Sequence, residues 1–261
     1  MQTPAPIEAL IAAAIASLRQ DGFAAALWAL MQGLAQPDNL IVLAYRDAGA
    51  PVVLQTQAGH PRVFAQLASR YLAGAYRLDP YYDLHLRRAA DGVYRIRDIA
   101  PDAFQRSRYH VEYFGQTTLI DEIAFVLPLA AGVSLNLCLG RDAGSRKTFS
   151  SAEIDACRRL SPVVAALARA QWRGLEAEAK PAEDTPALLI DAARRAGIAL
   201  SPRQATVALL ILRGHSTPSI GLHLGLSPQT VKVFRKQLYQ RCGISSQAEL
   251  FALMLPMLKD G

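Results

Sequence analysis

Cysteine is scarce in this chain of 261 residues. It contains three, Cys138, Cys157 and Cys242, an odd and scattered set. Such a set supports neither a disulfide framework nor a zinc site, and it is typical of reduced thiols in the cytoplasm. No apolar run reaches the roughly eighteen residues that a membrane span requires, and the N-terminal segment lacks the basic region of a signal peptide. The sequence therefore predicts a cytoplasmic protein with no membrane partner.

Motifs of catalysis and cofactor binding are also lacking. We find no Gly-x-Ser-x-Gly, no phosphate-binding glycine loop and no His-Glu-x-x-His. His110 and Glu112 have the spacing of a zinc deaminase, but no Cys-x-x-Cys follows to complete that site. Catalysis needs a convergent set of nucleophile, base or metal ligands. We therefore predict a protein that is not an enzyme and that uses no metal or cofactor.

The positive charge is concentrated at one end of the chain. Residues 187–261 carry nine Lys or Arg against three acidic residues, which accounts for the whole net charge of +6, whereas residues 1–186 are balanced. A basic excess on one small domain is the electrostatic pattern expected for binding phosphates. The alternative is the solvated basic face of a protein–protein adaptor.

The same end contains the pattern of two helices joined by a tight turn. Residues 217–224 are predicted to form the first helix, and Gly225 can adopt the left-handed conformation that ends it. Ser227 offers an N-cap, and proline suits the first position of a second helix over residues 228–241. This is a helix-turn-helix, whose second helix can enter the major groove of DNA.

Short motifs within this end carry a resemblance. They are Leu200-Ser-Pro-Arg203, Gly214, Ile220, Leu224-Gly-Leu-Ser227, Thr230-Val-Lys232, Tyr239, Gly243-Ile-Ser-Ser246 and Ala248-Glu-Leu250. With them, residues 198–255 resemble the DNA-binding domain of the LuxR/FixJ family of bacterial transcription regulators. The resemblance implies an all-α domain of four helices, in which the third helix reads bases and the last pairs two subunits. It also implies two groups of DNA contacts: Lys232, Val233 and Lys236 at base edges, and Gln229, Thr230 and Arg235 near phosphates.

The recognition helix departs from the family at Phe234-Arg235, where a histidine and an aliphatic residue are usual. Apolar residues on the buried side of a helix recur every three or four positions, as Val231, Phe234 and Leu238 do. We therefore expect these three to face the core and Arg235 to point to solvent or to the DNA backbone.

The last helix has an apolar face. Its members are Leu250, Leu253, Met254 and Met257. Such a face can be covered by two-fold packing against a second subunit. Packing within the same domain is the alternative.

The rest of the chain predicts a separate domain. Residues 175–186 are charged, contain two prolines and suit a linker. We therefore expect a ligand-sensing and dimerisation domain over 1–174 and a DNA-binding domain over 187–261, where Thr185-Pro186 caps a short helix, 187–196. In the first domain, helices are predicted at 7–19, 23–35, 61–75, 102–114 and 150–172, and strands at 40–45, 52–57, 123–129 and 133–141. Hairpin strands with helices at both ends indicate an α+β domain with a helix-covered antiparallel sheet, similar to GAF and PAS sensors.

One predicted strand alternates cleanly. Leucines at 135, 137 and 139 fall on one side, and Ser134, Asn136 and Cys138 fall on the other. In a GAF- or PAS-like sensor the second side lines a pocket. It can equally face solvent or a helix.

Tyrosines gather in one region, since seven of the nine lie between residues 71 and 113. Tyrosine offers an apolar ring with a hydroxyl that needs a partner, which suits a small, partly polar ligand. We predict a site in which Asp79 accepts a hydrogen bond from a ligand N–H group. The predicted walls are Tyr71, Tyr76, Tyr94, Tyr109 and Tyr113. The alternative makes Asp79 the N-cap of a helix that begins at Pro80.

This region is also similar to the autoinducer-binding domain of quorum-sensing LuxR proteins. Asp79 and Tyr94 stand where that domain has a ligand-contacting aspartate and a downstream aromatic residue. Gln66 and Arg70 stand where it has a tryptophan and a tyrosine. The resemblance therefore implies a related sensor fold with a ligand other than an acyl-homoserine lactone.

These observations predict a ligand-responsive transcription regulator that acts as a homodimer on double-stranded DNA. Ligand occupancy would shift the population of dimers that can bind DNA. The family resemblance makes RNA polymerase a candidate further partner. The alternative function is a constitutive adaptor or anti-activator that pairs with other regulators.

Overall fold

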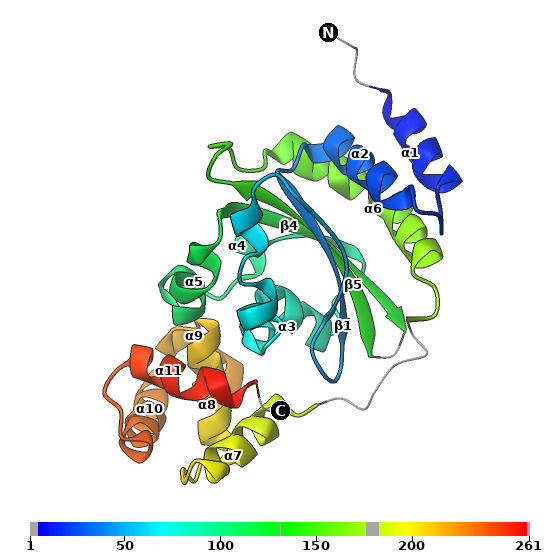
Figure 1. Cartoon of the computed structure of the whole chain (residues 1–261). Coiled ribbons are helices and arrows are strands. Elements are labelled where there is room, and N and C mark those ends of the chain that lie inside the picture. Colours follow the sequence, from blue (N-terminus) through cyan, green and yellow to red (C-terminus); the bar gives the residue numbers. More distant parts are fainter. Residues whose placement is uncertain (1–4, 131, 176–182, 260–261) are drawn as a thin grey trace. The chain divides into compact units, whose positions relative to one another are not determined.

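The N-terminal strands form one antiparallel sheet in the computed structural model, which describes residues 5–130, 132–175 and 183–259. The strand order is β2-β1-β5-β4-β3 (Figure 1). The strands are β1 (Asn39–Arg46), β2 (Val52–Ala58), β3 (Gly92–Arg95), β4 (Leu119–Ala130) and β5 (Val133–Asp142). Four of them confirm the sequence predictions within a few residues. The edge strand β3 was missed because its four half-buried residues show no alternation.

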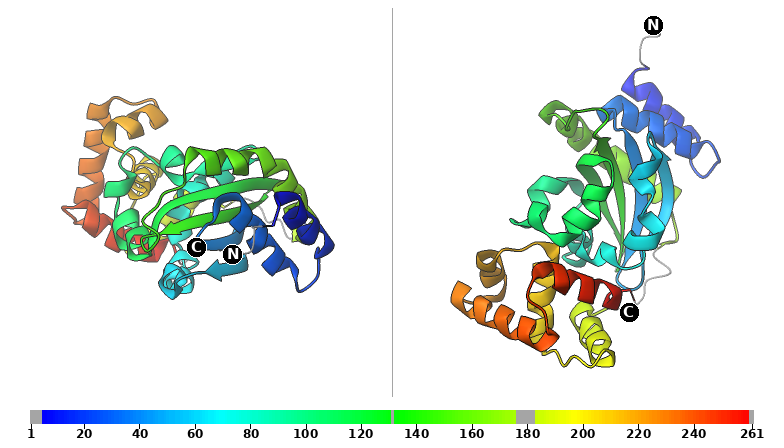
Figure 2. Two further views of the ribbon diagram at one scale, coloured as in Figure 1. Left: turned by 90° about the horizontal axis from the view of Figure 1, so that it is seen from above. Right: turned by 60° about the vertical axis from the view of Figure 1, so that its left-hand side comes forward.

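One face of the sheet forms the main core. Leu135, Leu137 and Leu139 are fully buried there. The helices α1 (Ile7–Ala16), α2 (Phe23–Ala35) and α6 (Ser151–Gln171) cover this face (Figures 1 and 2). The apolar alternation of β5 therefore identified the core side correctly.

The opposite face of β5 is buried as well. Ser134, Asn136 and Cys138 are each no more than 3% exposed. The Ser134 hydroxyl lies 2.8 Å from Nδ1 of His85, which belongs to α3 (Pro80–Leu86). This excludes the expectation that the polar side of β5 faces solvent.

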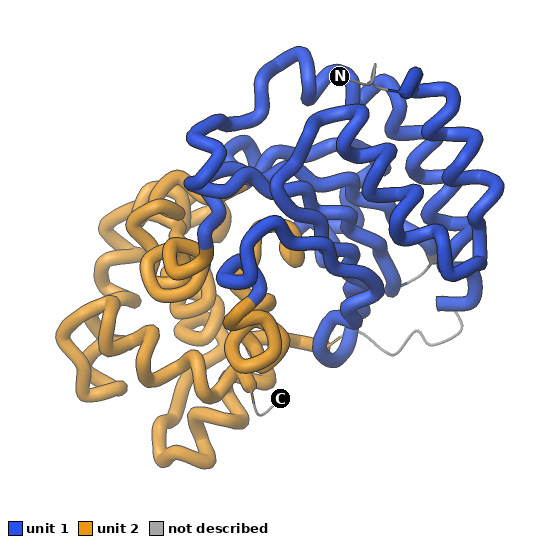
Figure 3. The backbone as a smooth tube through the Cα atoms, turned by 45° about the horizontal axis from the view of Figure 1, so that its top comes forward, with its two compact units in different colours: residues 1–64, 84–99, 118–181 blue, residues 65–83, 100–117, 182–261 orange. Residues whose placement is uncertain are grey.

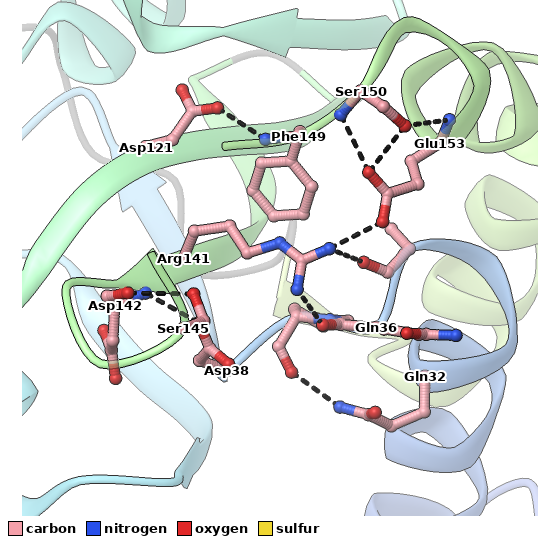
Figure 4. A network of polar contacts seen from close by, with 12 residues as sticks. Gln32, Gln36, Asp38, Asp121, Arg141, Asp142, Ser145, Phe149, Ser150 and Glu153 are labelled. Carbon is pink, nitrogen blue, oxygen red and sulfur yellow. Dashed lines mark hydrogen bonds and ion pairs between the residues drawn. The ribbon is translucent and has the colours of Figure 1, made fainter. Parts of the chain in front are cut away.

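A buried arginine connects the helices of this core (Figure 4). Arg141 of β5 donates to the carbonyl oxygens of Ala35 and Gln36 at 2.9 and 2.6 Å, where α2 ends, and pairs with Glu153 at 2.6 Å. Glu153 in turn closes a capping box with Ser150, the N-cap of α6. The end of α2 and the start of α6 are thereby joined through one side chain.

The chain divides into two units (Figure 3). The first comprises residues 1–64, 84–99 and 118–181, and the second residues 65–83, 100–117 and 182–261. The second unit therefore combines the helical C-terminal end with two segments that precede it in the sequence. Most of the predicted linker, residues 176–182, lies outside the described residues.

Two predicted helices are replaced by short turns. Residues 61–75 were expected to form one helix, but Gly74 has φ +142°, which no α-helix contains. Residues 102–114 are interrupted at Ser107, whose extended backbone (φ −68°, ψ 151°) lets its hydroxyl accept from the His110 N–H at 3.1 Å. The elements found in their place are η1 (Pro61–Phe64), η2 (Leu67–Tyr71), η3 (Ala75–Leu78), η4 (Phe104–Arg106), α5 (Arg108–Glu112) and η5 (Phe114–Gln116). The short helix α4 (Ile96–Ile99) lies between the two regions.

The C-terminal helices follow the predicted pattern. They are α7 (Thr185–Arg195), α8 (Pro202–Arg213), α9 (Thr217–Leu224), α10 (Pro228–Cys242) and α11 (Gln247–Met257). The N-cap of α7 is Asp184, which accepts from the Ala187 N–H at 3.2 Å, so the predicted cap at Thr185 was one residue too late. At α8, Ser201 and Gln204 form a capping box.

Candidate DNA interface and ligand site

The turn between α9 and α10 has the chemistry that the sequence predicts. Gly225 adopts the left-handed conformation (φ +64°) and ends α9. The Ser227 hydroxyl accepts from the Thr230 N–H at 3.0 Å, and Pro228 occupies the first position of α10. The helix-turn-helix is thus fixed by local interactions of its own residues.

The predicted base-reading residues lie on the exposed side of α10. Lys232, Val233 and Lys236 are exposed, Val233 to 46%. The predicted phosphate contacts are more varied, because Gln229 is exposed whereas Thr230 is half-buried, with its hydroxyl 2.8 Å from that of Ser227. One face of α10 therefore presents two lysines and an apolar side chain to solvent.

The buried side of α10 is partly as predicted. Val231 and Leu238 are fully buried. Phe234 is only half-buried, so the expected third core residue is a boundary residue. Arg235 is also half-buried, and its guanidinium lies 5.2 Å from the centre of the Tyr239 ring. The Arg235 side chain, which was expected to point to solvent or to the DNA backbone, therefore packs along the Tyr239 ring.

The apolar face of α11 is covered by its own chain. Leu250 and Met254 are fully buried and Met257 is 8% exposed, while Leu253 is half-buried. The covering elements include α7, α8 and α5 of the same unit. Of the two alternatives for this face, packing within the chain is the one that the structure contains.

Four of the predicted ligand-site tyrosines come together around Asp79 in the second unit. Tyr71 and Tyr109 both donate their hydroxyls to Oδ2 of Asp79, at 2.8 and 3.2 Å. Tyr113 completes the cluster, its ring centre 5.5 Å from those of Tyr71 and Tyr109. Tyr76 packs edge-on against Tyr71 at 6.4 Å. The topology thus assembles side chains from segments thirty residues apart.

The carboxylate of Asp79 has the N-cap role considered for it, and its second oxygen accepts from two tyrosine hydroxyls. Its Oδ1 accepts from the Tyr81 N–H at 2.8 Å, which caps the start of α3. Its Oδ2 faces the tyrosine hydroxyls. Burial raises the pKa of Asp79, and the hydrogen bonds from Tyr81, Tyr71 and Tyr109 only partly oppose this. Tyr94, by contrast, lies on β3 in the first unit, where its hydroxyl donates to the Ala90 carbonyl at 3.0 Å.

A buried polar network in the first unit was not predicted. Nε2 of His85 lies 3.2 Å from Asp47, its Nδ1 lies 2.8 Å from the Ser134 hydroxyl, and Arg88 pairs with Asp47 at 2.6 Å. Burial lowers the pKa of His85 to about 4, against the attraction of Asp47, so the ring is neutral at pH 7. Residues 47, 85 and 134 lie far apart in the sequence, and no local spacing could have signalled this group.

Two further searches cover only the described part of the chain. Within it, no group of three or more His, Cys, Asp or Glu side chains could hold a metal ion. No helix there is long and apolar enough to cross a membrane.

A basic recognition helix after a tight turn, together with an N-terminal α+β domain, defines a DNA-binding regulator. Residues 199–254 match the family described as "Bacterial regulatory proteins, luxR family". The chain therefore carries a LuxR-type helix-turn-helix domain at its C-terminal end, as its sequence motifs predicted.

Relatives of known name agree with this assignment. The chain is 29% identical over 184 residues to the Aeromonas salmonicida protein named "Putative HTH-type transcriptional regulator in exeN 3'region", which covers 68% of this chain and 93% of that protein. The family match and this relative are to DNA-binding regulators, the non-enzymatic class that the sequence predicted.

Solved structures resemble the N-terminal domain. The VqsR LBD domain from Pseudomonas aeruginosa aligns with 25% identity and a TM-score of 0.54, covering 63% of this chain and 94% of that one. The N-terminal fold thus resembles LuxR-type autoinducer-binding domains. Escherichia coli SdiA aligns over 97% of this chain and 99% of its own, with 16% identity and a TM-score of 0.40.

Proposed function

We propose that this LuxR-type regulator reads its operator with the exposed face of α10 and changes its affinity for DNA when a small molecule binds its N-terminal domain. The observation that carries the DNA part is the pair Lys232 and Lys236, exposed and one helical turn apart. Like charges at this spacing repel each other mildly. The negative charge of DNA would compensate the positive charges of both lysines.

Within this interface, one group of residues would contact base edges and another would contact phosphates. Lys232, Lys236 and the exposed Val233 would face base edges, where lysine recognises guanine and an apolar side chain can meet the thymine methyl group. Gln229, Thr230 and Arg235 would lie near phosphates, which fix the register without reading sequence.

The test compares lysine and arginine variants of the full chain on a selected operator. Lys232→Ala and Lys236→Ala should each cost on the order of 1–3 kcal/mol of specific binding. Arg235→Ala should weaken binding to all sequences alike and reduce the salt dependence. Lys147→Ala, an equal change of charge at an exposed site in the first unit, is the matched control. A larger change in sequence preference for Arg235→Ala than for either lysine variant would contradict these roles.

The same experiment separates this function from a constitutive adaptor or anti-activator. If the protein were an adaptor of that kind, the purified chain would show no saturable binding to DNA, whichever operator is selected. A regulator acting in the cytoplasm on promoters would bind, and RNA polymerase would then be its next candidate partner.

The proposed ligand contacts belong to the tyrosine-rich region. The hydroxyls of Tyr71 and Tyr109 and the aromatic faces of Tyr76 and Tyr113 offer polar and apolar contacts beside Asp79. A thermal-shift screen of a metabolite panel that includes acyl-homoserine lactones would identify the ligand class, and we expect the lactones to give no shift.

We further propose that the active form on DNA is a homodimer. Pairing through α11 would require its apolar face to leave the contacts that now bury Leu250 and Met254. Sedimentation of the full chain with and without operator duplex tests this. Two chains per duplex are expected, and one chain per duplex at saturation would contradict it.

A further inference from the structure

An open cleft lies among the short elements of the second unit. Its volume is about 440 Å³, which is within the range of small-molecule sites. The end of α8, the start of α9, one side of α10 and the first residue of α11 line it, together with Ala103 and Arg106 at η4. Neither the base-reading residues proposed on α10 nor the tyrosines proposed as ligand contacts are among its lining residues. The cleft is therefore distinct from both of those sites.

The deep part of the cleft is apolar. Ile211, Ile220 and Val231 line it, and each of them is no more than 3% exposed. They come from three different helices, α8, α9 and α10, whose packing forms this surface. An apolar surface of this kind favours the aromatic or aliphatic body of a ligand, because contact removes both surfaces from water.

Two arginines line the same cleft, and no acidic residue is among its lining residues. Arg106 is exposed and Arg235 is half-buried. Within the described part of the chain, neither of them forms an ion pair. The guanidinium of Arg235 lies 5.2 Å from the centre of the Tyr239 ring, which covers a face of that group. Its N–H donors lie in the plane of the group, so the ring leaves them available to an anion.

The wall that carries Arg106 is held by backbone contacts. The Ala103 N–H donates to the Gly214 carbonyl at 3.0 Å, and the Arg106 N–H donates to the Ala103 carbonyl at 3.0 Å. A Cβ at Gly214 would lie 2.9 Å from the Cα of Phe104, so the two backbones are in close contact. Arg106 therefore extends from an ordered turn, which lowers the entropy that a ligand must remove on binding.

The other polar groups near the cleft do not cancel this positive charge. Burial and the neighbouring His223 lower the pKa of His215 to about 4, so this lining residue is neutral at pH 7. The carboxylate of Asp102 accepts from the N–H and the hydroxyl of Ser216, and Asp102 is not among the lining residues. The cleft thus combines an apolar floor with two positive charges.

We propose that this cleft binds a small organic anion, namely a carboxylate or sulfonate on an aromatic or short aliphatic body. The body lies on the apolar floor, and the anionic group pairs with Arg106 and Arg235. A planar guanidinium matches such an oxyanion with two parallel hydrogen bonds. The cleft is thereby a second ligand site, in addition to the one proposed at the tyrosines.

Occupancy of the cleft affects DNA binding through Arg235. This residue is a proposed phosphate contact, so a bound anion competes with DNA for its guanidinium. This consequence rests on the proposed function. Binding of the anion itself does not, because it can be measured on the full chain without DNA.

The first experiment is a fluorescence titration of the full chain with anilinonaphthalene sulfonate. Phenylnaphthylamine, which has the same aromatic body without the sulfonate, is the matched probe. We expect Arg106→Gln and Arg235→Gln each to weaken binding of the sulfonate about five- to tenfold, and to change binding of the amine by less than about twofold. Arg203→Gln, an equal loss of charge at an exposed site outside the cleft, should change neither.

The second experiment separates an organic anion from a simple one. Phenylbutyrate should displace the bound sulfonate, whereas inorganic phosphate at the same concentration should not, because phosphate has no apolar body to cover the floor. Several results would overturn the site. They are absence of saturable sulfonate binding by the wild type, unchanged affinity in both cleft variants, equal losses in Arg203→Gln, and equal displacement by phosphate.

The third experiment repeats the displacement on a mixed-sequence DNA duplex. Saturating phenylbutyrate should weaken duplex binding by the wild type about threefold or more and that by Arg106→Gln by less than about twofold. Equal effects on both proteins would overturn the competition. If the wild type bound no duplex at all, the proposed function would fail, whereas the titrations without DNA would still decide the site.

Discussion

The Tyr71 hydroxyl donates to the buried carboxylate of Asp79 at 2.8 Å, across eight residues of the chain. That oxygen also accepts from Tyr109, while the other oxygen caps α3 through the Tyr81 N–H. One carboxylate thus satisfies three buried donors and connects two segments of the second unit. Its removal would take away the acceptor that these three donors share.

Substitution of Asp79 should separate its capping role from its role toward the tyrosines. Asp79→Ala removes three buried hydrogen bonds, and we expect a loss of about 3 kcal/mol or more in the free energy of unfolding. Asp79→Asn keeps a cap of similar strength but offers one acceptor oxygen, so we expect about 1–2 kcal/mol. Urea denaturation measures both. Equal losses would mean that the cap contributes nothing.

The raised pKa of Asp79 also predicts a pH dependence. Because the folded state favours the protonated carboxyl, its contribution to stability is complete below the unfolded pKa near 3.8 and is lost as pH rises through the folded pKa. Asp79→Asn should lack this loss. The check is unfolding free energy against pH for both proteins, and identical slopes above pH 4 would refute the assignment.

The lowered pKa of His85 predicts a pH dependence of stability with the opposite sign. Its pKa is lowered to about 4 by burial, so the unfolded chain binds a proton between its ordinary pKa near 6.5 and pH 4 whereas the folded chain does not. Stability should therefore fall as pH drops through this window. His110 and His215 also have lowered pKa values, so His85→Gln should reduce the slope without abolishing it.

Arg141 should contribute far more to stability than a surface arginine. Arg141→Met leaves the partly buried Glu153 and the carbonyls at the end of α2 without their donor, and we expect a loss of about 3 kcal/mol. Arg158 pairs with Asp155 at 3.2 Å, but both side chains are more than half exposed. Arg158→Met should therefore cost less than about 1 kcal/mol. Thermal unfolding of the two variants side by side tests the difference.

Gly214 and Gly225 form a natural comparison. Both have positive φ, but a Cβ at Gly225 meets open space whereas one at Gly214 meets the Phe104 backbone. Gly225→Ala should cost about 1 kcal/mol from backbone strain alone. Gly214→Ala should cost clearly more in the full chain, and the excess measures the contact with residues 102–107. Equal costs would show that this contact adds nothing to stability.

Local interactions explain what could be predicted in the C-terminal domain. The turn at Gly225, the cap at Ser227 and the limits of α9 and α10 depend on residues within a few positions of one another. The apolar side of β5 was equally predictable, because strand alternation is local. These features also identified the LuxR-type domain, which was recognisable from its motifs alone.

Features that depend on distant residues could not be predicted. No pattern near Phe234 indicates that it is only half-buried, and the alternatives for α11 could be separated only by the neighbours that cover Met254. Residues 61–75 were predicted to form one helix. Gly74 breaks that helix where its backbone lies against Leu258, a contact across the whole sequence.

The sequence by itself determined the class of this protein: a basic helix-turn-helix after an α+β domain, with tyrosines gathered beside Asp79. It could do so because caps, turns, alternation and local charge act over a few residues. Only the tertiary structure decided that Asp79 unites two tyrosine hydroxyls, that His85 is buried between Asp47 and Ser134, and that Asp102 lies on Ser216. Each of these pairings depends on which surfaces are buried together, and that is settled by the packing of the whole chain.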